Sequence, residues 1–127
     1  MAVIWVALGG ACGAVLRFGV SRALTPLASG YPVATLLVNV FGSFLIGLLA
    51  GSVLLENRLE PGAKLFFQSG LLGAFTTFST FSLETLQLWQ SGHSRLALAN
   101  VIVNVVFCLV AVAVGFGLGA ALAARVK

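Results

Sequence analysis

Long stretches without a charged residue limit what this chain can fold into more than any other feature of its sequence. They cover residues 23–55, 65–83 and 96–124, and a fourth one, 1–16, opens the chain. Each of them supplies roughly the 20 apolar residues that cross a bilayer as a helix. Only 8% of the 127 residues are charged, whereas an ordinary soluble domain has about 25%. A water-soluble globule is therefore excluded, and we expect an all-α membrane protein.

Turn signals divide the chain into four expected membrane-spanning helices within a single domain, residues 1–127. Pro26 and Pro32 interrupt the chain after the first helix, and the polar segments 56–62 and 91–95 supply the other connections. We expect helices over about residues 2–24, 33–55, 63–90 and 96–124. Each segment is apolar all round, which is typical of a membrane span. Little chain is left for a catalytic domain outside the membrane, so we predict that the protein is not an enzyme.

The remaining composition excludes several other classes. No Lys or Arg precedes the first apolar segment, so we expect no cleavable signal peptide. Cys12 and Cys108 lie inside apolar runs, where buried thiols are ordinary, and neither a disulfide framework nor a zinc site is expected. The net charge is +4, but the basic residues stand singly at segment ends. That arrangement predicts contact with membrane lipid and no nucleic-acid partner.

Several of the 15 glycines stand four residues apart inside the expected spans. Small residues at this spacing let membrane helices approach closely. We therefore expect close helix packing at three pairs, Gly9/Gly13, Gly47/Gly51 and Gly115/Gly119.

The third segment contains an unusual run, GLLGAFTTFSTFS at residues 70–82. One interpretation is an interrupted helix whose freed carbonyls can serve as cation ligands, since non-helical backbone at membrane depth must be satisfied by protein or water. The other is a straight helix in which Ser and Thr bond back to their own carbonyls. Composition alone leaves both open.

Aromatic and hydroxyl side chains share this part of the third segment. On a helix, Phe78 and Phe81 lie on one face, while Thr77, Thr80 and Glu84 lie on a neighbouring one. The positive edge of a phenyl ring beside hydroxyl donors can receive an anion without a fixed positive charge. Lipid contact or core packing is the alternative for the two Phe residues.

Other polar residues lie inside the expected spans. Asn39, Asn100 and Asn104 can bond across helices, and the Asn39 amide can also donate to an anion. Arg17 and Glu84 lie deeper than the other charges, which makes them functional candidates. A structural pair or contact with the membrane interface is the alternative for both.

The chain resembles the Fluc fluoride channels, also called CrcB. The resemblance rests on four short hydrophobic segments with Arg17 near the end of the first, Asn39-Val40-Phe41-Gly42 in the second and the run from Gly73 to Glu84 in the third. The resemblance covers essentially the whole chain. It implies passive, selective export of fluoride that lowers the cytoplasmic concentration and gives fluoride resistance. It also implies an antiparallel, dual-topology homodimer in the bacterial inner membrane, with the third helix broken near its middle.

The same resemblance implies roles for individual residues. Phe78 and Phe81 match the aromatic pair whose ring edges meet the ion, and Asn39 matches the pore amide. Ser79 and Thr80 match hydroxyls near the pore.

Further positions match by motif outside this central set. Gly73 and Thr76 match residues whose backbone carbonyls, two from each subunit, hold a structural sodium ion at the dimer interface. Arg17 and Glu84 match charged positions at a possible pore approach, and Asn104 takes a position that can be His. Cys108 stands where some relatives have a serine, which departs from the pattern because a thiol is the weaker donor.

Two alternatives belong to other classes. A four-helix, proton-coupled multidrug exporter needs a titratable carboxylate near mid-membrane, typically in the first helix, and residues 1–24 contain no Asp or Glu. A non-transporting assembly subunit would need no aligned polar side chains.

The basic residues also bear on orientation. Four spans place the middle connection and the C-terminus on one side, which then holds four basic residues against three on the other. Orientation follows the Lys and Arg excess in short loops, so this difference is too small to set one direction, and we expect insertion both ways. The first side has Arg58, Lys64, Arg125 and Lys127, and the second has Arg17, Arg22 and Arg95.

Overall fold

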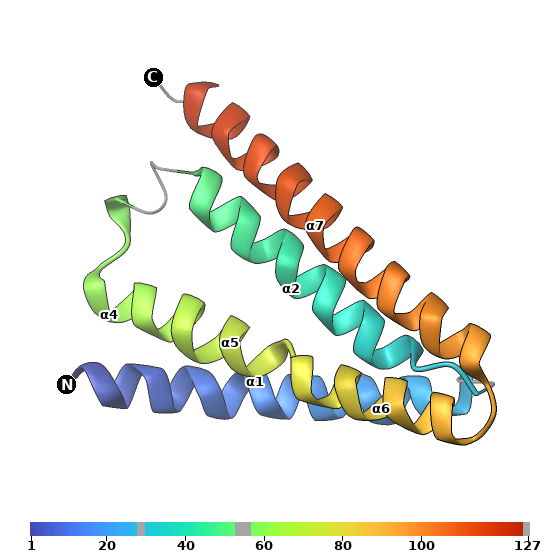
Figure 1. The fold of residues 1–127 in the computed structure, drawn as a ribbon. Coiled ribbons are helices and arrows are strands. Elements are labelled where there is room, and N and C mark those ends of the chain that lie inside the picture. Colours follow the sequence, from blue (N-terminus) through green and yellow to red (C-terminus); the bar gives the residue numbers. More distant parts are fainter. Residues whose placement is uncertain (28–29, 53–56, 126–127) are drawn as a thin grey trace.

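The computed structural model describes residues 1–27, 30–52 and 57–125. Within these ranges every regular element is helical (Figure 1), which confirms the all-α prediction. Helix α1, Ala2–Leu24, has the predicted bounds. A short 3₁₀ turn, Thr25–Leu27, follows it, and Gly30 adopts a φ of 85° that favours glycine.

Helix α2, Val33–Gly51, begins where the sequence predicts. It ends earlier than the expected residue 55, because Ser52 leaves the helical conformation with φ −87° and ψ 76°. Residues 53–55 lie outside the described ranges. Apolar composition continues past Gly51, so composition alone placed the end of this helix too late.

The third predicted segment consists of several helical pieces. Proline occupies the first turn of α4, where its missing N–H costs nothing, and π-helical turns (η2) follow. Thr76 and Thr77 are extended, with φ/ψ of −79°/155° and −150°/114°. The pieces are α4 (Pro61–Lys64), η2 (Leu65–Leu72), α5 (Gly73–Phe75) and α6 (Phe78–Gln90).

This geometry differs from the expected position of the non-helical residues. The sequence placed them at Gly73–Thr76, but Gly73 is helical and the extended pair lies at Thr76 and Thr77. Ser and Thr also bond back to their own carbonyls, since Thr85 Oγ1 donates to Phe81 O at 2.7 Å. The segment thus contains two extended residues as well as Ser and Thr side chains that bond back along their own helix.

Helix α7, Ser94–Arg125, completes the fold after a tight turn in which Gly92 has a φ of 83°. It begins two residues before the expected residue 96 and extends one past the expected residue 124.

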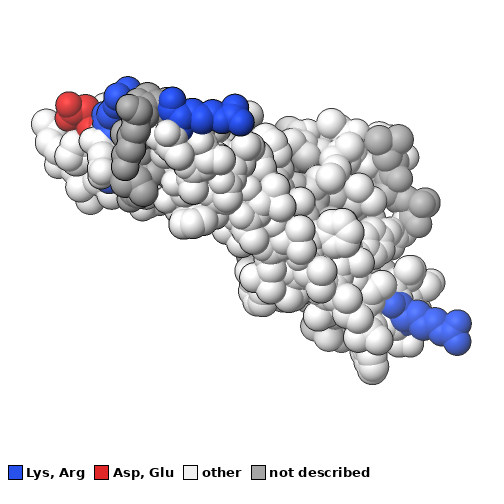
Figure 2. Space-filling view, turned by 90° about the horizontal axis from the view of Figure 1, so that it is seen from above, with Lys and Arg blue, Asp and Glu red and all other residues white. Residues whose placement is uncertain are grey.

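Within the described ranges, three helices are long and apolar enough to cross a membrane, namely α1, α2 and α7. The charged side chains visible in Figure 2 lie toward the two ends of the molecule, and the surface between them is uncharged on this face. This distribution fits an apolar belt in lipid with charged ends in water.

The helices pack in two pairs that diverge from one end of the molecule (Figure 1). Helix α2 packs along α7, and α1 packs along η2 and α5. Helix α6 contacts α7 and joins the pairs near their common end. The space between the diverging pairs positions the cavity described below.

The glycine pairs form the contacts within both helix pairs, as predicted. A side chain on Gly13 would collide with the carbonyl of Leu71, one on Gly47 with that of Val112, and one on Gly115 with that of Phe44. Backbone therefore meets backbone at these points, which is the close approach that small residues permit.

Two glycines of α7 provide a matched test of this packing. We expect Gly115→Ala to lower the free energy of unfolding by about 1–3 kcal/mol, the usual cost of overpacking. Gly117 has nothing within 4 Å of an added Cβ. Gly117→Ala should therefore be neutral or stabilising, because alanine is the better helix former. Unfolding of the purified variants in detergent measures both effects, and equal stabilities would contradict this account.

Candidate functional site

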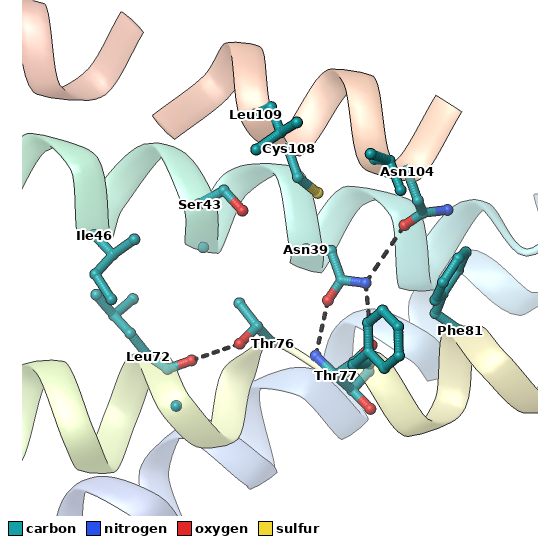
Figure 3. Close-up of a pocket in the computed structure, with 14 residues that line it drawn as sticks. Asn39, Ser43, Ile46, Leu72, Thr76, Thr77, Phe81, Asn104, Cys108 and Leu109 are labelled. Atoms are coloured by element: carbon teal, nitrogen blue, oxygen red, sulfur yellow. Dashed lines mark hydrogen bonds between the residues drawn. The ribbon is translucent and has the colours of Figure 1, made fainter. Parts of the chain in front are cut away.

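A cavity of about 410 Å³ lies between α2, the third segment and α7 (Figure 3). It brings together six of the residues singled out from the sequence. These are Asn39, Gly73, Thr76, Phe78, Phe81 and Asn104.

Asn39 fixes the extended residues of the third segment to α2. Its Oδ1 accepts a hydrogen bond from Thr77 N at 2.8 Å, and its Nδ2 donates to Thr77 O at 3.1 Å. The side-chain amide therefore satisfies both backbone groups of a buried residue outside a helix, and buried backbone groups must be paired. Gly42, one turn later, leaves room for the methyl group of Thr76, since a Cβ there would collide with it.

Thr77 also begins helix α6. Its Oγ1 accepts from Thr80 N at 3.2 Å and lies 3.0 Å from Thr80 Oγ1. A threonine in this position satisfies one of the backbone donors that the first turn of a helix leaves free. Ser79 lies at the exposed start of α6, 3.4 Å from the Thr77 hydroxyl.

The polar groups continue from Asn39 onto α7. Asn39 Nδ2 lies 3.4 Å from Asn104 Oδ1, and Asn104 Nδ2 donates to Asn100 Oδ1 at 2.9 Å. Asn100 Nδ2 in turn donates to Thr85 Oγ1 at 2.9 Å. Both amide hydrogens of Asn39 thus have partners within the chain.

The two predicted aromatic residues lie together but differ in exposure. The ring centroids of Phe78 and Phe81 are 5.3 Å apart. Phe81 is 6% exposed and packs inside the chain, whereas Phe78 is 76% exposed. The Phe78 ring therefore has one face on the surface of this chain.

The far wall of the cavity has weaker donors. Figure 3 shows the Ser43 hydroxyl and the Cys108 thiol directed into the cavity from α2 and α7. Cys108 is the position where the sequence departs from the family pattern. The Ser43 hydroxyl on α2 faces the same cavity as this thiol.

A second cavity, of about 220 Å³, lies between α1, α2 and the start of α6. Arg17, Ser21, Thr35 and Thr80 line it with polar groups. Thr77 lines both cavities.

Arg17 and Glu84, which the structure describes, do not pair with each other. Glu84 Oε1 accepts from Thr35 Oγ1 at 2.8 Å. The other carboxylate oxygen of Glu84 and Nε of Arg17 are buried without a hydrogen-bond partner in the described part of the chain. The structure therefore shows no ion pair between these two described residues.

Sequence reasoning missed three residues of this site. Thr77 was placed only on a helix face, although a threonine just before a helical run is a usable signal for a helix start. Ser43 and Thr35 each lie four residues from Asn39 on α2, and that helical spacing puts them on the same face.

The side chains that line the first cavity can contact a small anion. Its walls hold the side-chain amides of Asn39 and Asn104, hydroxyls and the Phe81 ring beside the positive end of α6, and the amide hydrogens are bonded within the chain. Among the described residues, no cluster of three His, Cys, Asp or Glu could bind a metal ion.

Apolar helices with charged ends, and a cavity where a few polar side chains stand among apolar ones, define a multi-pass membrane protein. Residues 4–116 match the family described as CrcB-like protein, Camphor Resistance (CrcB), and the chain belongs to this family.

Curated relatives cover most of the chain. A protein of Saccharophagus degradans is 50% identical over 114 residues, which are 88% of this chain and 86% of the relative. One of Magnetococcus marinus is 47% identical over 120 residues, 94% of this chain and 98% of the relative. One of Ruminiclostridium cellulolyticum is 43% identical, with 89% and 88% covered. All three are named fluoride-specific ion channel FluC.

Proposed function

We propose that the chain forms a fluoride-selective channel that lets fluoride leave the cell passively and so lowers its cytoplasmic concentration. The names of its close relatives support this function and do not support the proton-coupled exporter. They also agree with the prediction that the chain is not an enzyme. The single observation in the structure that carries the proposal is the first cavity, where amide, hydroxyl and Phe81 ring groups meet without a fixed cation.

Fluoride is small and strongly hydrated, so a pathway must replace many hydrogen bonds to admit it. An unpaired buried ion would cost tens of kcal/mol on an idealised estimate. The bond between Asn39 and Asn104, at 3.4 Å, is the longest in the amide series and the easiest to exchange for an anion. Ser79 and Thr80 add hydroxyls at the start of α6, and the ring edges of Phe78 and Phe81 add a weak positive potential.

We infer that the third segment crosses the membrane as a broken helix. Broken membrane helices present the positive end of one half to anions and free carbonyls of the other half to cations. Here α6 begins and α5 ends at the extended pair Thr76 and Thr77.

The end of α5 offers oxygen atoms for the proposed structural sodium ion. Thr77 N would bond Gly73 O in a continuous helix, but it donates to Asn39 instead. Gly73 is not tightly packed, since an added Cβ would make only an ordinary van der Waals contact, 3.7 Å from Gln68 O. The residues therefore fit the ion, and the carbonyls of Gly73 and Thr76 would hold it as part of the dimer interface.

We further propose an antiparallel homodimer of single four-helix domains, surrounded by lipid in the bacterial inner membrane. The exposed Phe78 supports a second copy beside the first cavity. Arg17 and Glu84 would then stand at the polar approach, near the second cavity.

Fluoride efflux from liposomes that contain only this protein tests the function. Fluoride should leave without ATP or a proton gradient, and chloride should stay. Equal fluoride and chloride fluxes would contradict the proposal, and absence of any ion flux would favour the assembly subunit.

Phe78→Ile and Phe81→Ile test the aromatic pair. Each removes the positive ring edge, so fluoride flux should fall about fivefold, which corresponds to roughly 1 kcal/mol of lost ring-edge interaction. Phe107→Ile is the matched control, because Phe107 is exposed on α7 and lines no part of the first cavity. Parent-like flux in both pore variants would show that the pair is ordinary packing.

Replacement of sodium by a large organic cation tests the ion site. We expect the dimer to dissociate or lose activity, because four backbone oxygens would face one another without a cation. Size-exclusion chromatography and flux measure these outcomes. An intact, fully active dimer after exhaustive exchange would argue against the site.

A C-terminal reporter tests the orientation. It should be found on both sides of the membrane, and two Lys residues added at the C-terminus should shift it to one side and reduce activity. A copy biased oppositely should restore activity. A reporter confined to one side in the fully active parent would refute dual topology.

A further inference from the structure

Asn100 is a fully buried polar residue that does not line either cavity described above. Its side chain is 0% exposed on α7. An amide buried this deeply must have its hydrogen bonds satisfied within the protein. Asn100 donates to Thr85 and accepts from Asn104, both at 2.9 Å. It therefore connects α6 with the amide that faces the first cavity.

The hydrogen bonds in this series all run in one direction. Asn39 donates to Asn104, Asn104 to Asn100, and Asn100 to Thr85. Thr85 closes the series by donating to Phe81 O at 2.7 Å.

Thr85 sets this direction. A hydroxyl has a single hydrogen, and Thr85 uses it on the carbonyl of Phe81, so only its oxygen lone pairs remain for Asn100. Asn100 must then turn its NH₂ toward Thr85 and its oxygen toward Asn104. Asn104 in turn directs its NH₂ to Asn100, donating to the side-chain oxygen at 2.9 Å and to the backbone carbonyl at 3.1 Å. Its own oxygen faces Asn39, which Figure 3 shows.

We propose that Thr85 and Asn100 are positioning residues of the ion pathway, which orient Asn104 and, through it, the Asn39 amide at the extended residues. This inference rests on the proposed function for its consequence in transport. Reversal of Asn104 would set its NH₂ against the NH₂ of Asn39. This repulsion would weaken the hydrogen bonds by which Asn39 holds both backbone groups of Thr77.

Four single variants test this role in reconstituted protein. Thr85→Val keeps the shape but removes the hydroxyl, and Asn100→Leu removes the amide. Each should lower fluoride flux about tenfold, the factor that matches one lost hydrogen bond of about 1.4 kcal/mol. Thr85→Ser should restore parent flux to within about twofold, since the hydroxyl remains. Ser82→Ala is the control, because Ser82 bonds back to Phe78 O at 2.8 Å on the same helix with no amide attached.

A double variant distinguishes a positioning role of Thr85 and Asn100 from a general loss of stability. The double variant Thr85→Val/Asn100→Leu should conduct like Asn100→Leu alone, because residues in one series of hydrogen bonds are not additive. Multiplicative losses in the double variant would overturn the proposal.

Hydrogen exchange provides a readout that does not depend on transport. The Thr77 amide is protected by Asn39, so in Thr85→Val it should exchange roughly tenfold faster, while in Ser82→Ala it should not change. Unchanged exchange at Thr77 in Thr85→Val overturns the positioning role whatever the flux. If the parent itself transports no fluoride, the proposed function fails and the exchange rate alone decides on Thr85 and Asn100.

Discussion

Backbone groups at membrane depth have no water to bond, and the rest of this structure depends on how one residue meets that constraint. Thr77 leaves the helical conformation, and the amide of Asn39 takes the place of the two hydrogen bonds that a helix would supply. This substitution lets α5 end and α6 begin inside the protein. Loss of the side-chain amide would leave two buried backbone groups unpaired, each at a cost of about 1–3 kcal/mol.

The glycine contacts and the cavity are two results of the same packing. Lipid removes the hydrophobic drive for helices to associate, so close backbone approach holds each pair together. Gly13 and Gly47 provide that approach within the two pairs. Because the pairs diverge, side chains cannot fill the space between them, and the polar residues Asn39 and Asn104 line it.

The sequence was sufficient to predict where apolar helices occur, but not the details of backbone and hydrogen bonding inside the protein. Charge-free runs predicted the bounds of α1 and the start of α2, because a bilayer selects for apolar length. They could not reveal the π-helical turns at Leu65–Leu72, since α and π turns bury the same apolar composition. Family resemblance named Asn39 and the Phe pair. The resemblance did not show that both amide hydrogens of Asn39 bond within the chain. One of them bonds Thr77, which lies 38 positions away in the sequence, so the contact depends on the fold.

Thr77 lines both cavities, and this affects how an electric potential would be distributed inside the protein. The energy that opposes an ion in a membrane depends on how much low-dielectric material separates it from water. Where water fills both cavities, that material is reduced at this point to the side chain and peptide of a single residue. With one cavity open to each side of the membrane, a voltage would fall mainly across Thr77 and its immediate neighbours. The field would be steepest where the backbone is held by one asparagine.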